Sequence, residues 1–244
     1  MNTRLTTAFV GLASASAALL KPIRLTTATH HFCFSTMSDD NTDVRAEKQA
    51  LRKVLRAKMK NVENIGIESL AVWKRVYELP AYKNAKTIGL FLSMPQSEIQ
   101  TDAILNHAIE NGKTVYVPQV GANFEHADMD LLKCPTVPNF HKQWPTNKWN
   151  IPEPPSDLEQ VVAQPGELDL LIVPGLAFDS NGGRLGQGKG YYDRFIAKMR
   201  KDHKTPILVA VGLELQLVDH IPTHEHDFTM EVVVLPNQTI HVPV

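Results

Sequence analysis

Hydrophobic residues along the chain fall into short unbroken runs and longer spaced patterns, which together predict a protein of alternating strands and helices. Residues 170–173 (Leu-Leu-Ile-Val) form an apolar run closed by a proline and a glycine, which is typical of a strand buried on both faces of a parallel sheet. Residues 87–93 and 114–117 are also poor in polar side chains and predict two further strands. Because open α/β sheets bind ligands at the carboxyl ends of their strands, we expect a functional loop after residue 173.

Four segments carry apolar side chains at helical spacing. They are the segment from Thr42 or Asp43 to about Met59, residues 68–79, residues 101–110, and the stretch that begins at Tyr191. The order of strands and helices predicts an α/β fold with three αβα layers and a mostly parallel, twisted sheet with right-handed crossovers. We expect residues 39–244 to form a single domain.

The composition suits a globular enzyme and argues against several other classes. The 244 residues are 43% hydrophobic, which is enough for one substantial core, and the formal net charge is -1. No long segment after the amino terminus is strongly basic, so we expect no nucleic-acid partner. Cys33 and Cys134 are isolated, which predicts a reducing compartment and no disulfide framework.

The first 38 residues differ from the rest of the chain. They contain Arg4, Lys21 and Arg24, many Ser, Thr and Ala residues, and no acidic residue. This composition predicts a mitochondrial transit peptide and a location in the mitochondrial matrix. A secretory signal is the alternative, but its apolar core would be diluted by glycine and serine, and it is too short and polar to span a membrane. Met37 could serve as an internal start and give a cytoplasmic form.

A glycine-rich stretch after the predicted strand at 170–173 is the main candidate for a functional site. It contains Gly182, Gly183, Gly186, Gly188 and Gly190. Glycines let backbone N–H groups approach an anion closely, and Lys189 adds a mobile positive charge. The run 183–189 fits the start of a Walker A loop, yet Gly190 stands where that motif needs Ser or Thr. The alternative is a surface hairpin whose glycines only satisfy turn geometry.

The stretch PGLAFDSNGGRLGQGKGYYDRF, at residues 174–195, resembles the signature of the 5-formyltetrahydrofolate cyclo-ligase family, also called methenyltetrahydrofolate synthetases. Four other segments resemble this family in the same order. They are KQALRKVLR at 48–56, LFLSMPQSEIQT at 90–101, KWNIPEP at 148–154 and EHDF at 225–228. The resemblance covers nearly everything from Asp43 onward.

The resemblance implies an ATP-dependent reaction. Its substrates would be 5-formyltetrahydrofolate, with or without a polyglutamate tail, and MgATP, and its products 5,10-methenyltetrahydrofolate, ADP and phosphate. The formyl oxygen would attack the γ-phosphate to give a phosphorylated imidate, and N10 would then close the ring. No dedicated general base is needed, because the amide oxygen is itself the nucleophile. The resemblance also implies a monomer without a membrane partner.

The resemblance further assigns roles to residues of this chain. Lys189 and Arg184 would be catalytic, because they stabilise the charge that develops in phosphoryl transfer. The nucleotide would contact Lys48, Arg52, Arg184, Gly186, Gly188, Lys189, Gly190, Tyr191 and Tyr192. The folate would contact Leu92, Glu98, Gln187, Gly188, Lys189, Gly190 and Tyr191. Asp193 and Asp227 would hold Mg²⁺.

Residues 134–165 contain seven prolines together with Phe140, Trp144 and Trp149. Such a run predicts a long ordered loop that crosses the edge of the sheet. A generic linker is the alternative, but linkers rarely contain two tryptophans. Aromatic rings beside a cleft would suit the flat rings of a folate, and Trp149 is the preferred wall residue on the substrate side.

Other interpretations remain open from the residues alone. Lys48 and Arg52 lie four residues apart and by themselves predict only a solvated basic stripe on a helix. A histidine-rich stretch near the carboxyl end could ligate a transition metal, although no cysteine completes a zinc site. The residues concerned are His220, His224 and His226, together with Glu225 and Asp227. A metal role for Glu231 is a separate open question, because the resembling family frequently has an aspartate at its position. A sugar-phosphate isomerase, a coenzyme A transferase-like enzyme or a non-catalytic nucleotide-binding regulator could also use such a glycine loop.

Overall fold

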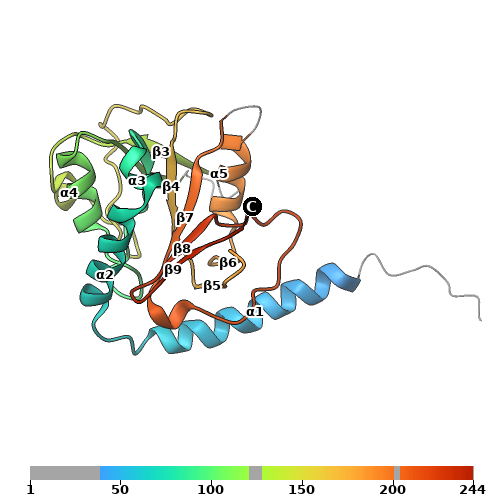
Figure 1. The fold of residues 1–244 in the computed structure, drawn as a ribbon. Coiled ribbons are helices and arrows are strands. Elements are labelled where there is room, and N and C mark those ends of the chain that lie inside the picture. The colour runs from blue at the N-terminus through green and yellow to red at the C-terminus, as the bar shows by residue number, and fades with distance from the viewer. Residues whose placement is uncertain (1–38, 121–127, 201–203, 244) are drawn as a thin grey trace, which may run out of the picture. The chain divides into compact units, whose positions relative to one another are not determined.

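A seven-stranded sheet forms the centre of the protein, as the computed structural model shows for residues 39–120, 128–200 and 204–243 (Figure 1). The strands are β1 (Thr87–Gly89), β2 (Thr114–Val120), β3 (Met129–Lys133), β4 (Leu170–Val173), β7 (Ile207–Val211), β8 (Val232–Val234) and β9 (Thr239–His241). Their order across the sheet is β3-β2-β1-β4-β7-β8-β9, and only the edge strands β3 and β9 pair antiparallel. The expected transit peptide and Met37 lie outside the described residues.

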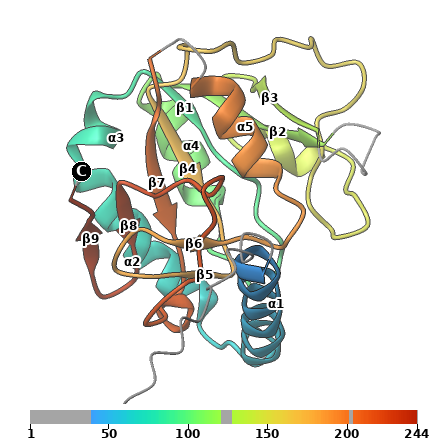
Figure 2. The same ribbon diagram turned by 90° about the vertical axis from the view of Figure 1, so that its right-hand side faces the viewer.

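Helices cover both faces of this sheet. They are α1 (Asp39–Met59), α2 (Ile65–Glu78), α3 (Pro80–Asn84), α4 (Asp102–Glu110) and α5 (Tyr191–Arg200), with short 3₁₀ helices η1 (Phe140–Gln143) and η2 (Glu214–Gln216). Helices α2, α3 and α4 lie on one face and α5 on the other (Figures 1 and 2). A separate hairpin pairs β5 (Ala177–Phe178) with β6 (Arg184–Leu185). None of the helices in the described ranges is long and apolar enough to cross a membrane.

Two cores arise because successive side chains of a strand point to opposite faces. In β4, Leu170 and Ile172 belong to the core that contains buried residues of α2, α3 and α4, whereas Leu171 and Val173 belong to the core beneath α5. All four residues of β4 are therefore buried, which explains the unbroken apolar run in the sequence. The expected three-layer αβα fold with a mostly parallel sheet is confirmed.

Helix α1 packs against the β5–β6 hairpin, and only its last residue in the described ranges, Met59, joins the core shared with α2, α3 and α4. Its fully buried Leu55 joins Ala177, Leu185 and Ile221 in a third, smaller core. Figure 2 shows α1 beside this hairpin. The hairpin lies immediately after β4 in the chain, so α1 reaches the carboxyl end of that strand.

Several predicted boundaries differ from the structure. The expected strand 87–93 stops at Gly89. The N–H of Leu90 still donates to the carbonyl of Tyr116 (2.9 Å), and the chain then enters a loop. Helix α2 begins at Ile65 rather than at residue 68. The proline-rich segment contains only η1 and isolated bridges, and it returns along the edge strand, where Ala163 N–H donates to the Leu131 carbonyl (2.9 Å).

Candidate active site

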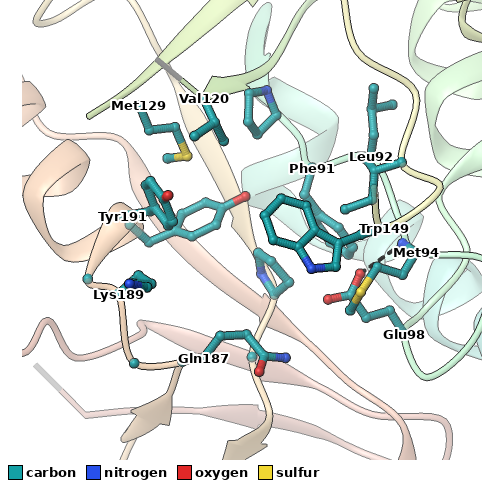
Figure 3. Close-up of a pocket in the computed structure, with 18 of the residues that line it drawn as sticks. Phe91, Leu92, Met94, Glu98, Val120, Met129, Trp149, Gln187, Lys189 and Tyr191 are labelled. Atoms are coloured by element: carbon teal, nitrogen blue, oxygen red, sulfur yellow. Dashed lines mark hydrogen bonds between the residues drawn. The ribbon is translucent and has the colours of Figure 1, made fainter. Parts of the chain in front are cut away.

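A cavity of about 640 Å³ opens at the carboxyl ends of β1, β2 and β4, where an α/β sheet normally binds its ligand. Every residue expected to contact nucleotide, folate or metal lines it. These residues are Lys48, Arg52, Leu92, Glu98, Trp149, Arg184, Gly186, Gln187, Gly188, Lys189, Gly190, Tyr191, Tyr192, Asp193 and Asp227. Figure 3 shows Lys189 and Tyr191 on one side of the cavity, with Phe91, Glu98 and Trp149 on the other.

The glycine loop between β6 and α5 forms one wall. Gly188 and Gly190 have φ values of 101° and 74°, which side chains rarely adopt, and a Cβ on Gly186 would lie 2.9 Å from Nη1 of Arg184. The expectation that all five glycines form one anion cradle is wrong. Gly182 and Gly183 lie in the β5–β6 turn instead and do not line the cavity. These two glycines therefore serve turn geometry, as the hairpin alternative expects, but both are buried rather than at the surface.

Three cations follow one another along α1 at intervals of one helical turn, and two of them contact the glycine loop. Lys48 forms an ion pair with Asp227, and Nε of Arg52 donates to the carbonyl of Gly186 (2.9 Å). Arg56, which lies one turn further along, donates Nη2 to both the carbonyl and Oε1 of Gln187 (3.0 Å each). Burial and the neighbouring Arg56 lower the pKa of Arg52 from its usual value. The sequence interpretation missed Arg56, although the resembling segment 48–56 ends on it.

A second ion pair lies between the hairpin and α5. Arg184 is 8% exposed and donates Nη2 to both carboxylate oxygens of Asp193 (2.9 and 3.0 Å), while its guanidinium carbon lies 5.7 Å from the centre of the Tyr192 ring. Both carboxylates expected to hold Mg²⁺ thus pair with cations expected to hold phosphate. Lys189 is exposed and has no ion pair among residues of the described ranges.

The opposite wall carries two carboxylates, Glu98 and Glu153, among mostly apolar side chains. Oε2 of Glu98 accepts a hydrogen bond from the N–H of Met94 (3.0 Å; Figure 3). Burial raises the pKa of Glu98 to about 7, because a single backbone donor offsets little of the desolvation. Burial, and then the nearby Glu98 charge, raises the pKa of the Tyr192 hydroxyl well above its usual value.

Trp149 stands on a loop that Asn147 organises. Oδ1 of Asn147 accepts the N–H groups of Trp149 (2.9 Å) and Ile151 (3.2 Å), and its Nδ2 donates to Oε1 of Glu153 (2.9 Å). The tryptophan side chain remains 45% exposed, with the ammonium of Lys148 4.3 Å from its ring centre. A ring held this way can lie against a flat ligand. Asn147 was not predicted, although it directly precedes the resembling segment 148–154.

Part of the cavity wall had no recognisable signal in the sequence. Pro118 and Val120 of β2 and Met129 of β3 line the cavity, and Val120 pairs with Met129 across the two strands. The sequence predicted β2 only as far as Val117 and did not predict β3. Val120 and Met129 add an apolar surface beside Tyr191 (Figure 3).

Within the described ranges, no group of three or more His, Cys, Asp and Glu side chains could hold a metal by itself. His226 lies at the surface, 3.3 Å from Glu225, which leaves the transition-metal alternative without a ligand set in this part of the chain. Glu231 does not line the cavity. It accepts the N–H of Leu208 and lies 3.7 Å from Arg200, so it links β7 to the start of β8.

Comparison with known proteins agrees with this geometry. Residues 44–236 match the model of the 5-formyltetrahydrofolate cyclo-ligase family. A 5-formyltetrahydrofolate cyclo-ligase from Mus musculus is 32% identical over 195 residues, which cover 78% of this chain and 94% of the mouse protein. A mitochondrial 5-formyltetrahydrofolate cyclo-ligase from Arabidopsis thaliana is 29% identical over 217 residues, covering 81% of this chain and 76% of that protein.

A solved structure leads to the same result. The 5,10-methenyltetrahydrofolate synthetase of Aquifex aeolicus is similar with a TM-score of 0.65 and 25% sequence identity, and the match covers 81% of this chain and 93% of that one. The sequence match, the fold and the placement of the signature residues around one cavity exclude the isomerase, transferase and regulator alternatives. This chain belongs to the 5-formyltetrahydrofolate cyclo-ligase family.

Proposed function

We propose that this enzyme converts 5-formyltetrahydrofolate to 5,10-methenyltetrahydrofolate and consumes one ATP in each turnover. The division of the cavity between two kinds of wall is the observation that carries the proposal. One wall has glycines and cations suited to a polyphosphate, and the other has mostly apolar side chains, the ring of Trp149 and the carboxylate of Glu98, which suit a pteridine. Both substrates would therefore meet within a single cavity.

The reaction requires a phosphoryl transfer followed by a ring closure. The formyl oxygen forms a bond to the γ-phosphorus while the bond from that phosphorus to ADP breaks, which gives a phosphorylated imidate. N10 then bonds to the formyl carbon, and the carbon–oxygen bond breaks to release phosphate, which takes up the N10 proton. Since no side chain has to accept a proton in this scheme, the protein acts by positioning and charge stabilisation.

The cations around the glycine loop would stabilise the transferred phosphoryl group. Lys189 is exposed on the loop and can reach a phosphate without leaving an ion pair, whereas Arg184 would have to share its guanidinium between Asp193 and the phosphate. Lys48 and Arg52 would reach the phosphates from α1. Developing negative charge is best stabilised by donors that are held in position, and the buried Arg184 would provide one once Asp193 turns to the metal.

Asp193 and Asp227 would hold Mg²⁺, which would neutralise negative charge on the phosphate oxygens. Both carboxylates line the cavity, although each now faces a cation of the protein. This donor set fits Mg²⁺ that arrives on a nucleotide, because such an ion needs only one or two protein carboxylates beside phosphates and water. When MgATP binds, both ion pairs would open. The carboxylates would then turn to the metal and the cations to the phosphates.

We also propose that residues 1–38 direct the chain to the mitochondrial matrix, and that Met37 starts a second, cytoplasmic form. The basic composition of the segment supports the first part, and one similar enzyme, from Arabidopsis thaliana, is named as mitochondrial. Amino-terminal sequencing of the protein from both cell fractions would test the proposal. A single start common to both fractions would contradict it.

The activity can be tested by the ultraviolet absorbance of the methenyl product. The purified enzyme should produce this absorbance from 5-formyltetrahydrofolate only when ATP and Mg²⁺ are both present, and it should release ADP in equal amount. Absence of an ATP-dependent signal would reject the function. ATP hydrolysis without the methenyl product would show that the folate wall is wrongly assigned.

A further inference from the structure

The Glu98 carboxylate on the folate wall belongs to a loop rather than to a helix or strand. Glu98 lies within residues 93–101, whose two ends are joined by paired side chains. The N–H of Ser93 donates to Oγ1 of Thr101 (3.1 Å), and the N–H of Thr101 donates to Oγ of Ser93 (3.2 Å). Ser97 has a φ of 70°, which costs a non-glycine residue on the order of 1 kcal/mol. Something other than backbone preference must keep Glu98 in place.

Gln100 provides that restraint within the loop. Its Nε2 donates one hydrogen bond to the carbonyl of Met94 and one to the carbonyl of Glu98, both at 2.9 Å. An amide NH₂ group has two donors, and both are used here. Met94 is also the residue whose N–H holds the Glu98 carboxylate. One side chain thus fixes both the backbone of Glu98 and the donor of its carboxylate.

The backbone of Gln100 is in turn fixed to α2. Its N–H donates to Oγ of Ser69 (2.9 Å), and its carbonyl accepts Nε1 of Trp73 (2.7 Å). Ser69 and Trp73 are both buried in the helix face that packs against the sheet. The position of Glu98 is therefore set from the core, through α2 and Gln100, and not by the loop alone.

We infer that Gln100 is the positioning residue that sets the affinity for the folate, by holding Glu98 in the geometry that the pteridine requires. The inference rests on the proposed function, in which Glu98 accepts hydrogen bonds from the folate. Without the two donors of Gln100, the carbonyls of Met94 and Glu98 lose their partners, and the strained loop relaxes away from the cavity. Gln100 does not itself line the cavity and need not touch the substrate.

The test compares Gln100→Met with Gln96→Met. Methionine has a similar size and no donor, and Gln96 is an exposed residue of the same loop whose side chain makes no hydrogen bond within the described ranges. Gln100→Met should raise KM for 5-formyltetrahydrofolate about tenfold, as expected for about 1.4 kcal/mol of lost binding, and leave kcat and KM for ATP within about twofold. Gln96→Met should leave all three unchanged.

The outcomes separate this inference from the proposed function. If the wild-type enzyme forms no methenyl product, the proposed function itself fails. If it does form product and Gln100→Met keeps a wild-type folate KM, the inference is overturned. An equal rise in both KM values would also overturn it, because general loosening would then explain the effect. Should Gln100→Met not fold, Ser69→Ala removes the acceptor for the Gln100 N–H and should raise the folate KM selectively, by a smaller factor.

Discussion

Four charged side chains in the cavity neutralise one another in pairs, and this determines how single substitutions should act. Lys48 pairs with Asp227, and Arg184 pairs with Asp193, with both cations almost fully buried. Removal of one partner leaves a buried charge without compensation, which costs more than the pair itself contributes. Variants that remove a carboxylate will therefore mix lost metal binding with lost stability, and variants of the cations are easier to interpret.

The Lys48→Met variant should change two affinities in opposite directions. ADP should bind about tenfold more weakly, because a charged hydrogen bond to phosphate is lost. Mn²⁺ without nucleotide should bind more tightly than to the wild type, because Asp227 no longer faces a cation. Calorimetry can measure ADP binding, and electron paramagnetic resonance can measure free Mn²⁺. Lys53→Met, at an exposed position of α1, should change neither, and weaker binding of both ligands to Lys48→Met would contradict the exchange of partners.

Lys189 should be indispensable for turnover. We expect Lys189→Ala to lower kcat by about a thousandfold, because it removes a charge that stabilises the transferred phosphoryl group. The melting temperature should stay near that of the wild type, since the side chain is exposed. Steady-state kinetics of methenyl product formation would measure the effect, with Lys53→Ala as the control. Near wild-type activity in Lys189→Ala would remove the role assigned to the glycine loop.

Glu98 should make both folding and folate binding depend on pH. Burial raises its pKa from 4.5 to about 7, so the folded state retains a proton that the unfolded chain loses. The associated stability is complete below pH 4.5 and is lost as the pH rises through about 7. The free energy of unfolding of Glu98→Gln, relative to the wild type, should therefore increase by about 2–3 kcal/mol across this range.

Denaturant titrations of both proteins at matched pH values would measure this difference. The folate KM of the wild type should fall as the pH rises through about 7, because the ionised carboxylate is the better hydrogen-bond acceptor. A stability difference that is independent of pH would show that Glu98 is ionised throughout.

At the scale of elements, α1 and the β5–β6 hairpin form a unit beside the sheet and carry most of the basic side chains that line the cavity. Leu55 of α1 packs on Ala177 and Leu185 of the hairpin, and Arg52 binds the loop that follows it. The buried carboxylate of Asp179 accepts the N–H groups of Gly183 (2.8 Å) and Ile221 (2.9 Å), so it ties the turn of the hairpin to the segment that leads to Asp227. The shape of the hairpin therefore controls both ion pairs.

Gly182 should be far less replaceable than another glycine of similar conformation. Gly182 and Gly112 have φ values of 80° and 72°, but a Cβ would lie 2.4 Å from the Met230 carbonyl oxygen at Gly182 and would meet nothing at Gly112. We expect Gly112→Ala to cost about 1 kcal/mol through its dihedral angle alone, and Gly182→Ala to cost several times more. Thermal unfolding of both variants would measure this, and equal losses would show that the turn can move.

The sequence predicted an element correctly where all residues of that element are buried in the same way. The strand at 170–173 is covered on both faces and therefore shows an unbroken apolar run, and the same argument could have found β7 (Ile207–Val211), which was not predicted. The edge strand β3 includes Asp130 and Lys133, and its short run shows no clear period. A short strand of mixed composition leaves too weak a pattern for this reasoning.

At the scale of the whole molecule, the sequence predicted which residues gather at the cavity, but not what holds them there. The predicted site residues lie in recognisable segments, and all of them line one cavity. Arg56, Asn147 and Gln100 act through contacts with other parts of the chain, and the Arg56 contact joins residues 131 positions apart. No local pattern reveals such contacts. The roles of the cavity residues, including the metal ligands, stay predictions for the experiments above.

The pairing of Lys48 with Asp227 also bears on how the enzyme matures. The two residues are 179 positions apart, so during synthesis the first helix emerges from the ribosome long before the turn that it must meet. Until that turn is made, the cations of α1 have neither the carboxylate nor the finished glycine loop to contact. A nascent or truncated chain would therefore bind nucleotide poorly, and catalytic competence should appear only once the carboxyl-terminal segment has folded.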